Sequence, residues 1–444
     1  MATFNESGQE TESTPAVEDM VITDNNEPNN NESEFNRKTI DSLGNRVRLT
    51  DKDETSGLEL FCYVQCNSND TLALRQCRGV VFHEDQLVMQ AFPYTIEYVH
   101  TDLDIINNNL GNILNECKFF DAYEGNLIRM FYFSDRWYIS THRKLNAFRS
   151  KWAARESFGT CFKKALDQLY DDNEQFRNNI PDGEENLLDR FQNTLDKNKQ
   201  YMFLVMHSIE NRIVCSTPEN PTVYHVGSFV NGKLDMKDNC NVPYPQEHTF
   251  KNINDVVEHV KNVDIRYLQG LICFGPDNKQ YKIIHKEYNE LFRARGNEPS
   301  IKFRYIQTRM NRRMVDMLYH LYPDMTKIFE EIENSIYQIS KNIYNSYVQR
   351  FIKKKFVTVP TEEFNVIKEC HKWHEVDRVN NRINIDKVIE ILNQQTPTSI
   401  NRMIRRYRTE QNDGKLVKKN NQDRLRSSTV TSETEAKNQN NMEE

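Results

Sequence analysis

Residues 119–128 have the sequence Phe-Phe-Asp-Ala-Tyr-Glu-Gly-Asn-Leu-Ile. Apolar residues continue from there to Phe133, and a second apolar run covers Trp137 to Ser140. Runs of this length rich in aromatic and β-branched residues are typical of strands, and Ser134-Asp135 between them is a turn pair. We therefore predict an antiparallel pair, with one strand over 119–133 and the other over 137–140.

Similar strand patterns recur along the first two thirds of the chain, with helical spacing between them. Asn231-Gly232 accepts the positive φ angles of a tight turn and predicts a hairpin. The further predicted strands are 58–65, 80–89, 201–206, 223–230, 233–234 and 268–274. Apolar residues at spacings of three and four predict helices near 145–152, 187–195 and 256–260. This mixture predicts an α+β domain.

From Tyr305 onward the strand pattern disappears, and an all-α domain is predicted. A stripe of apolar residues spaced three and four apart indicates one long helix beginning after Pro323. Its members are Ile328, Ile332, Ile336, Ile339, Ile343 and Tyr347. Thr361 and Ser399 are predicted N-caps of two later helices, because a side-chain hydroxyl can accept a hydrogen bond from the first turn.

The charge distribution separates the ends of the chain from its body. The net charge is −7, but the first 36 residues carry nine acids and no Lys or Arg, so removing them leaves +2. A segment so polar cannot bury enough apolar surface to offset the entropy of ordering. We therefore predict a disordered acidic tail over 1–40, an α+β domain over 41–304, the all-α domain over 305–411 and a second disordered tail over 412–444.

Several classes of protein are excluded by composition. No apolar run approaches the roughly 20 residues of a membrane-spanning helix, and the N-terminus lacks a signal-peptide core, which argues against a membrane or secreted protein. The nine cysteines are scattered without a Cys-x-x-Cys pair, so we expect reduced thiols and neither a disulfide framework nor a zinc ribbon.

Residues 119–128 resemble motif I of the covalent nucleotidyltransferases, the superfamily of RNA ligases, DNA ligases and capping enzymes, in which a lysine followed by x-[DE]-G accepts the nucleotide. Other segments resemble further motifs of phage RNA ligase 1 type enzymes in the same order. These segments are 75–82 for the strand before motif I, 137–141 for motif III, 211–214 for the end of motif IV, and 269–272 with 281–284 for motif V. The resemblance implies a nucleotidyltransferase, ATP-grasp-like ligase domain over about 70–290.

The chemical positions of this pattern are substituted. Ala122 replaces the motif I lysine and offers no amine to attack a phosphate. Residues 201–206 lack the motif IV carboxylate, and in motif V Gln269 replaces Glu while Ile284 replaces the second Lys. Lys118 lies four residues before Ala122, roughly 13 Å away on an extended strand, which is too far to substitute. We therefore predict a pseudoenzyme without a catalytic nucleophile and without a metal site.

The resemblance also implies which residues would contact ligands. The nucleotide-binding candidates are Arg78, Glu124, Gly125 and Lys282, although for Glu124 and Gly125 a purely structural turn is an equal alternative. ATP and Mg²⁺ are expected as cofactors only if the protein is active. The RNA-binding candidates are Arg143, Lys144, Arg149, Lys151, Arg155 and Arg212.

Five of these cations fall within 141–155, where Phe148 and Trp152 supply aromatic rings. Cations attract phosphate and aromatic rings stack on unpaired bases. The alternative is an amphipathic helix that buries Leu145, Phe148 and Trp152 and leaves the cations in water. Further basic clusters occur in the helical domain; each alone is more usually a solvated helix face, and together they could form a surface that binds RNA or an acidic partner. These clusters are Arg309, Arg312 and Arg313, then 353–355, then Arg402, Arg405, Arg406 and Arg408.

Taken together, the pattern is similar to the RNA-ligase-like proteins of large cytoplasmic DNA viruses. It implies a viral protein of the host cytoplasm or virion that binds RNA or another nucleic acid, or docks in a viral complex, without forming an enzyme-nucleotide. Two alternatives stay open. One is an active RNA ligase or RNA repair enzyme that uses a displaced nucleophile or pre-adenylated RNA. The other is a scaffold subunit of a viral transcription or virion assembly.

Overall fold

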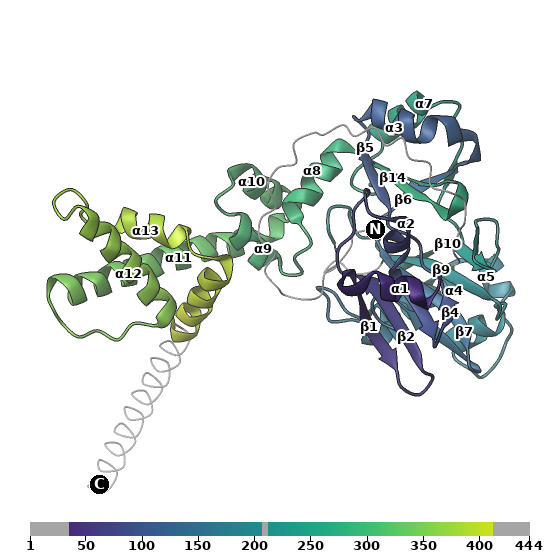
Figure 1. The fold of residues 1–444 in the computed structure, drawn as a ribbon, viewed down its shortest axis with the longest axis horizontal. Helices are drawn as coiled ribbons and strands as arrows, with labels where there is room; N and C mark the ends of the chain where they lie inside the picture. Colours follow the sequence, from purple (N-terminus) through teal and green to yellow (C-terminus); the bar gives the residue numbers. More distant parts are fainter. Residues whose placement is uncertain (1–34, 207–211, 412–444) are drawn as a thin grey trace, which may run out of the picture. The chain divides into compact units, whose positions relative to one another are not determined.

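The structure is a computed structural model in which residues 35–206 and 212–411 are described. The chain divides into two compact units at residue 299/300, so the boundary predicted at 304/305 falls inside helix α9, Ile301–Thr308. Figure 1 shows the α+β unit with its strands and the helical unit that follows it in the chain. The predicted α+β class with a helical C-terminal region is confirmed.

The described part of the first unit contains three β-sheets. The first is antiparallel with strands β1 Val47–Asp53, β2 Leu58–Tyr63, β3 Arg78–His83 and β4 Gln86–Met89 in that order. The second is antiparallel in the order β11 Lys233–Asp235, β10 Thr222–Val230, β9 Lys199–Met206, β7 Asn126–Phe133 and β8 Arg136–Ser140. The third has the order β12 Glu247–His248, β6 Lys118–Ala122, β13 Gly270–Phe274, β14 Gln280–Ile284 and β5 Ile96–Val99, with one parallel pair, β14 and β5.

The predicted strand over 119–133 is two strands. Residues 123–125 interrupt it, so that β6 and β7 belong to different sheets. The turn at Ser134-Asp135 does join β7 to β8 as predicted, and both turn residues have positive φ. The Asn231-Gly232 hairpin between β10 and β11 is also confirmed, with φ angles of 50° and 79°.

One hydrophobic core joins the three sheets. It includes Leu60 of the first sheet, Leu204 and Val226 of the second, and Phe120 and Phe274 of the third. Helices cover the outer faces: Phe162 of α4 packs against Phe203 with ring centroids 5.3 Å apart. The helices of this unit are α1 Arg37–Ser42, α2 Leu72–Gln76, α3 Leu103–Leu110, α4 Phe158–Asp172, α5 Glu174–Asn178, α6 Leu187–Asn193, α7 Ile253–Lys261 and α8 Lys286–Arg295.

Helix α1 corrects the predicted extent of the acidic tail. Asn36 caps the helix through the Thr39 backbone N–H, and Ile40 is buried in the core. Arg37 forms an ion pair with Glu59 of β2 at 2.6 Å. Residues 37–40 are therefore ordered because they have both a cap and a buried anchor. The rest of that tail, residues 1–34, and the second tail, 412–444, lie outside the described residues.

The described part of the second unit, 300–411, contains helices and connecting loops but no strand. Its helices are α9, α10 Arg312–Leu321, α11 Thr326–Tyr347, α12 Thr361–Val376, α13 Ile385–Asn393 and a last helix over 397–411. The predicted isoleucine stripe on α11 is confirmed, because it forms the centre of this unit's core. Two predicted caps are wrong by a few residues. Thr361 is the first helical residue after Pro360, and Thr396, rather than Ser399, accepts the capping hydrogen bond.

Candidate functional site

The segments that resemble motifs I and V are neighbours in the third sheet. Strand β6 pairs antiparallel with β13, which pairs with β14, and Ala122 lies opposite Gly270, which lies opposite Ile284. Gly270 has a φ of +144°, and a Cβ there would lie 2.1 Å from the carbonyl oxygen of Ile283. The two substituted positions, Ala122 and Ile284, therefore flank a point where only glycine fits.

Lys118 lies at the opposite end of the same strand. The pairing of β6 with β13 runs without a register shift from Ala122 opposite Gly270 to Lys118 opposite Phe274. An unbroken extended strand separates residues four apart by roughly 13 Å. Lys118 is therefore remote from Ala122.

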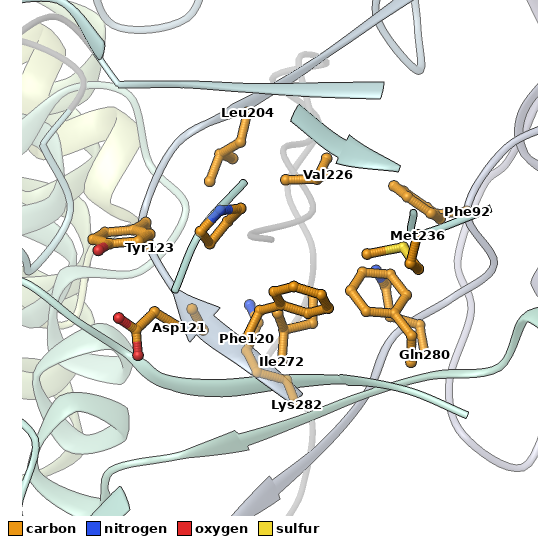
Figure 2. Close-up of a pocket in the computed structure, with 13 residues that line it drawn as sticks. Phe92, Phe120, Asp121, Tyr123, Leu204, Val226, Met236, Ile272, Gln280 and Lys282 are labelled. Atoms are coloured by element: carbon orange, nitrogen blue, oxygen red, sulfur yellow. The ribbon is translucent and has the colours of Figure 1, made fainter. Parts of the chain in front are cut away.

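A small cavity, which we call the inner cavity, lies beside Ala122 between the second and third sheets. It encloses about 30 Å³ and is lined mainly by apolar side chains, among them Phe92, Phe120 and Met236 (Figure 2). Lys282 is the one lysine among the described residues that line it. This volume holds roughly one water molecule, whereas pockets for small-molecule ligands enclose roughly 300 Å³ or more. A nucleotide could enter only if these side chains moved.

The ammonium group of Lys282 already has protein partners. Its Nζ donates to Oε1 of Gln269 at 2.9 Å and lies 3.4 Å from the carboxylate of Glu97 on β5. The side-chain nitrogen of Gln269 donates in turn to the Tyr123 carbonyl at 3.1 Å. Gln269 therefore links the end of motif I to the remaining lysine of motif V.

Glu124 acts as a clamp between three segments. Its carboxylate accepts from the backbone N–H groups of Val214 at 2.9 Å and Cys215 at 3.1 Å, and from the Tyr288 hydroxyl of α8 at 2.8 Å. Burial raises the pKa of Glu124, and these hydrogen bonds only partly offset it. An ionised carboxylate has about four acceptor sites, so these contacts use most of them. The geometry favours the structural alternative for Glu124.

Arg78 and Gly125 line a second cavity of about 30 Å³, which we call the arginine cavity, together with Arg129. A Cβ on Gly125 would lie 2.8 Å from the Val205 carbonyl, so glycine is required where this loop meets β9. Arg78 donates to the hydroxyl of Thr95 at 3.1 Å. No ion pair among the described residues involves Arg78 or Arg129.

Arg129 was not predicted from the sequence. It is fully buried on β7, and its guanidinium donates to the carbonyl oxygens of Gly79 and Thr141. Burial lowers the pKa of Arg129 to about 9, so it keeps its charge at neutral pH. The two carbonyl oxygens are hydrogen-bond acceptors that partly offset the cost of burying this cation without a carboxylate partner. The signal available in the sequence was an arginine among the apolar residues of a strand.

A larger opening, the outer cleft, lies beside β8. It encloses about 360 Å³ and is lined by Asp51, Lys52, Asp53, Arg136, Trp137, Tyr138, Ile139, Leu145, Asn146, Phe148 and Arg149. Asp53 binds Arg136 and also accepts from Tyr138 at 2.8 Å. Phe148 is 40% exposed, and Arg149 is exposed and makes no ion pair with a described residue. The cleft therefore presents an aromatic ring beside an unneutralised cation.

The segment 141–155 is a loop, which corrects the predicted amphipathic helix. Its one regular element is a short 3₁₀ turn, Ala147–Arg149. Leu145 and Trp152 are buried as expected, but Phe148 is exposed. Trp152 packs beneath the guanidinium of Arg295 at 5.4 Å, so its ring is occupied.

The six predicted RNA-binding cations are divided by this structure. Arg149, Lys151 and Arg155 are exposed on the loop. Arg143 is buried, and Lys144 lies 3.6 Å from the carboxylate of Asp51. Arg212 bonds to the Val214 carbonyl at 3.3 Å. Three of the six candidates therefore share one exposed loop.

The remaining predictions concern the motif IV segment and the basic clusters of the helical unit. Strand β9 covers the motif IV segment 201–206 and carries no acid, while Asn211 lies outside the described residues. In the helical unit, Arg309 pairs with Glu333 at 2.7 Å and Arg406 pairs with Glu362 and Glu363. The Arg309 side chain is only 8% exposed, so the solvated-face explanation does not hold for it, while the partly exposed Arg406 is neutralised by the two carboxylates.

No protein-family model matches the chain. Among solved structures it is similar to a proposed ATP-dependent DNA ligase from Aquifex aeolicus, with 14% identity and a TM-score of 0.35 over 69% of this chain and 80% of that one. It is also similar to an archaeal ATP-dependent RNA ligase, with 8% identity and a TM-score of 0.34 over 62% and 70%.

In sequence, the chain is similar to two viral proteins. The immediate-early protein ICP-46 homolog of Invertebrate iridescent virus 6 is 29% identical over 83% of this chain and 85% of its own length. The protein of the same name in Invertebrate iridescent virus 3 is 27% identical over 84% and 80%. Across residues 35–206 and 212–411, the structure contains no helix with the length and hydropathy needed to cross a membrane.

Proposed function

We propose that this protein is a ligase-like pseudoenzyme that binds RNA without forming an enzyme-nucleotide intermediate. The observation that carries the proposal is Ala122 beside a cavity of about 30 Å³ whose one lysine, Lys282, is already bonded to Gln269. Covalent nucleotide transfer requires a free amine within reach of a phosphate. Neither Ala122 nor the remote Lys118 supplies one.

The outer cleft and its loop support RNA as the partner. Phe148 offers a ring face for an unpaired base, and Arg149, Lys151 and Arg155 supply positive charge along the same loop. Stacking combined with backbone attraction is the usual mode of single-strand binding. Arg78 and Lys282 would contact phosphate if a nucleotide entered the smaller cavities. In that state ATP and Mg²⁺ would be the ligands.

The names of the similar iridovirus proteins support a viral protein, and we propose the host cytoplasm or the virion as its location. Both are described as immediate-early proteins. As part of the proposal, we infer that the present chain is also an immediate-early viral protein.

Covalent labelling tests the missing chemistry. The full chain is incubated with α-labelled ATP or GTP and Mg²⁺ or Mn²⁺, denatured and separated by electrophoresis. We expect no label on the protein, while an active RNA ligase in a parallel reaction is labelled. An acid-labile covalent label would overturn the proposal, and its loss in Lys118→Ala or Lys282→Ala would identify the displaced nucleophile.

Pre-adenylated RNA tests the active-ligase alternative separately, because sealing it needs no lysine nucleophile. We expect the protein to bind this RNA in a gel-shift experiment without joining it to an acceptor strand. Joined product would support the enzyme alternative even if the labelling result is negative.

The scaffold alternative is favoured by one feature of the helical unit. Large apolar side chains are exposed at the end of α12 and in the segments that flank it, and Phe356 is 91% exposed. The others are Ile352, Val376 and Val379. Exposed apolar groups of this size often mark protein contacts. Recovery of the chain in a large viral complex, combined with no measurable RNA binding, would favour the scaffold function over the proposed one.

A further inference from the structure

Three metal-binding side chains converge on the outer side of the third sheet. Asp121 lies on β6, His248 on β12 and His259 on α7, and one donor atom of each lies within 4.8 Å of the other two. Side chains alternate along a strand, so Asp121 faces away from its neighbours Phe120 and Ala122. Figure 2 shows the Asp121 carboxylate pointing away from Phe120 and Lys282.

The contacts within this cluster leave room for a shared ligand. Nε2 of His248 lies 2.8 Å from Oδ1 of Asp121. The ring of His259 lies 4.5 Å from that of His248, yet its nitrogens make no hydrogen bond to a described residue. The hydrogen bond between His248 and Asp121 explains why these two side chains lie together. It does not explain why His259 lies beside them.

The surrounding structure holds the three donors in place. Phe250 packs against both histidine rings and, edge to face, against Phe119 of β6 at 5.3 Å. The buried residues Val256 and Val260 anchor α7 in the same core. Such an apolar surround restrains ligand side chains and excludes competing water.

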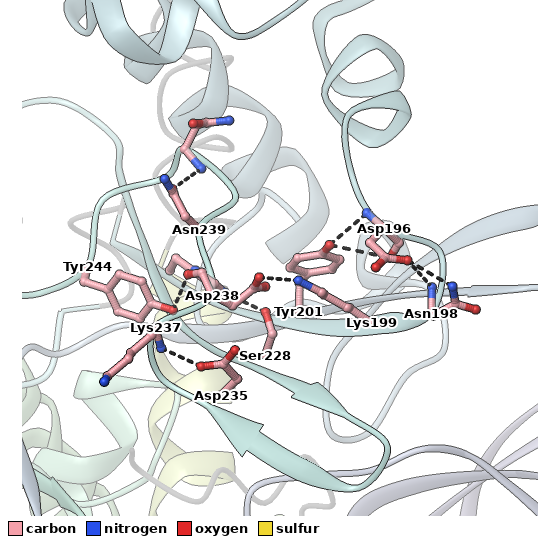
Figure 3. Close-up of polar contacts among 12 residues, drawn as sticks. Asp196, Asn198, Lys199, Tyr201, Ser228, Asp235, Lys237, Asp238, Asn239 and Tyr244 are labelled. Atoms are coloured by element: carbon pink, nitrogen blue, oxygen red, sulfur yellow. Dashed lines mark hydrogen bonds and ion pairs between the residues drawn. The ribbon is translucent and has the colours of Figure 1, made fainter.

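The loop that leads to His248 is also fixed. Asp238 pairs with Lys199 of β9, and its carbonyl accepts from the Tyr244 hydroxyl at 2.7 Å (Figure 3). Asp121 N–H then donates to the Gln246 carbonyl at 3.0 Å, immediately before β12. His248 therefore reaches the cluster from a braced segment.

We propose that Asp121, His248 and His259 bind a divalent transition-metal ion, with Zn²⁺ as the favoured ion and water completing its coordination. Two imidazoles and one carboxylate suit Zn²⁺, whereas Mg²⁺ and Ca²⁺ prefer oxygen donors alone. Tetrahedral Zn²⁺ places its donor atoms about 3.3 Å apart. The donor atoms already lie within 4.8 Å of one another, and the 22% exposure of the His248 side chain gives the ion access.

The proposal is independent of RNA binding, and it assigns a structural task to the cluster. The ion would tie β12 and α7 to the end of β6, one residue before Ala122. It requires no nucleotide and no catalysis. The metal can therefore be tested alone.

The test uses the full chain, stripped of metal with a chelator and titrated with Co²⁺ and then Zn²⁺. We expect one Co²⁺ per chain with visible d–d absorption, displaced by Zn²⁺ and not by Mg²⁺. Because the chain has nine cysteines, thiolate-to-cobalt charge-transfer absorption is the signature of a competing site. Its appearance in place of the nitrogen–oxygen spectrum would overturn the assignment.

Variants identify the donors. His259→Ala should weaken Co²⁺ binding more than about 100-fold, because a direct ligand contributes more than its supporting shell. Asp121→Asn should do the same. His285→Ala is the matched control, since the His285 ring lies 5.0 Å from that of His100 and outside the three-residue cluster, and it should leave the affinity unchanged. Equal affinity in His259→Ala and the unmodified protein, both folded by circular dichroism, would refute the site.

Discussion

The inner cavity and the outer cleft lie in the same unit and differ in almost every property that matters for binding. The first encloses about 30 Å³ behind apolar side chains, whereas the second encloses about 360 Å³ at the surface. Lys282 in the inner cavity is bonded to Gln269, while Arg149 in the outer cleft has no ion-pair partner among the described residues. The contrast supports the proposal that the position of Ala122 is closed and that a ligand would bind at the outer cleft.

The largest expected effect comes from Ala122→Lys, which attempts to restore the missing amine. Ala122 is 4% exposed, so the new side chain must displace packed apolar groups and bring a charge into them. We expect a loss of about 4 kcal/mol in the free energy of unfolding, measured by urea denaturation, and no covalent nucleotide. Lys118→Ala is the control and should change stability little.

If Ala122→Lys were as stable as the unmodified protein and accepted nucleotide, the inner cavity would be able to open. The inner cavity would then be closed only in the absence of a nucleotide, and the two regions would not differ in their capacity to bind one.

Acid should weaken the closed region. His225 of β10 is fully buried next to the Val226 that lines the inner cavity, and burial lowers the pKa of His225 to about 4. Its ordinary pKa is 6.5, so between pH 6.5 and 4 the unfolded state binds more protons and stability falls as pH falls. We expect the free energy of unfolding to fall by about 3 kcal/mol over this range. Urea denaturation at each pH measures this change.

His225→Gln supplies the comparison for this pH series. The variant is less stable at neutral pH, because it loses the 3.0 Å contact between His225 and Ser228, but its stability should fall less steeply between pH 6.5 and 4. Parallel curves for both proteins would show that another group causes the acid sensitivity.

The smallest effect concerns the outer cleft. Phe148→Ala should weaken binding of single-stranded RNA about tenfold, which corresponds to about 1.4 kcal/mol of lost stacking. Fluorescence anisotropy with labelled RNA measures this change. Tyr267→Ala is the matched control, because Tyr267 is another exposed ring beside an arginine, 5.5 Å from Arg266, and lies outside the cleft lining. Equal losses in both variants would show that the cleft has no special part in binding.

The sequence predicted the elements whose signal is local. Asn231-Gly232 specifies its own turn, and the isoleucine stripe of α11 specifies the buried face of a long helix. The segment 141–155 shows where such reasoning fails. Leu145 and Phe148 have helical spacing, but the carboxylate of Asp51 accepts from the Leu145 backbone N–H at 2.8 Å, and Asn146 accepts from that of Phe148 at 2.9 Å. Side chains thereby take the donors that a helix would need.

Some residues of the candidate site could likewise be located from the sequence, and others could not. Ala122 and Lys282 could be located from motif order alone, and the substitutions at Gln269 and Ile284 were visible directly. Val214 lies 90 positions from Glu124, His248 lies 127 positions from Asp121, and Gly79 lies 50 positions from Arg129, so no local pattern contains these contacts.

The contacts of Glu124 also affect the order in which the domain folds during synthesis. Its carboxylate is bonded to residues 90 and 164 positions later in the chain, Val214 and Tyr288. Contacts at such separation form after local structure, because the ends of a long loop must first meet. During synthesis the loop after β6 thus cannot gain its last contact until Tyr288 has left the ribosome. A nascent chain stopped before α8 should leave this loop open to proteases, although every motif that resembles a ligase is already present.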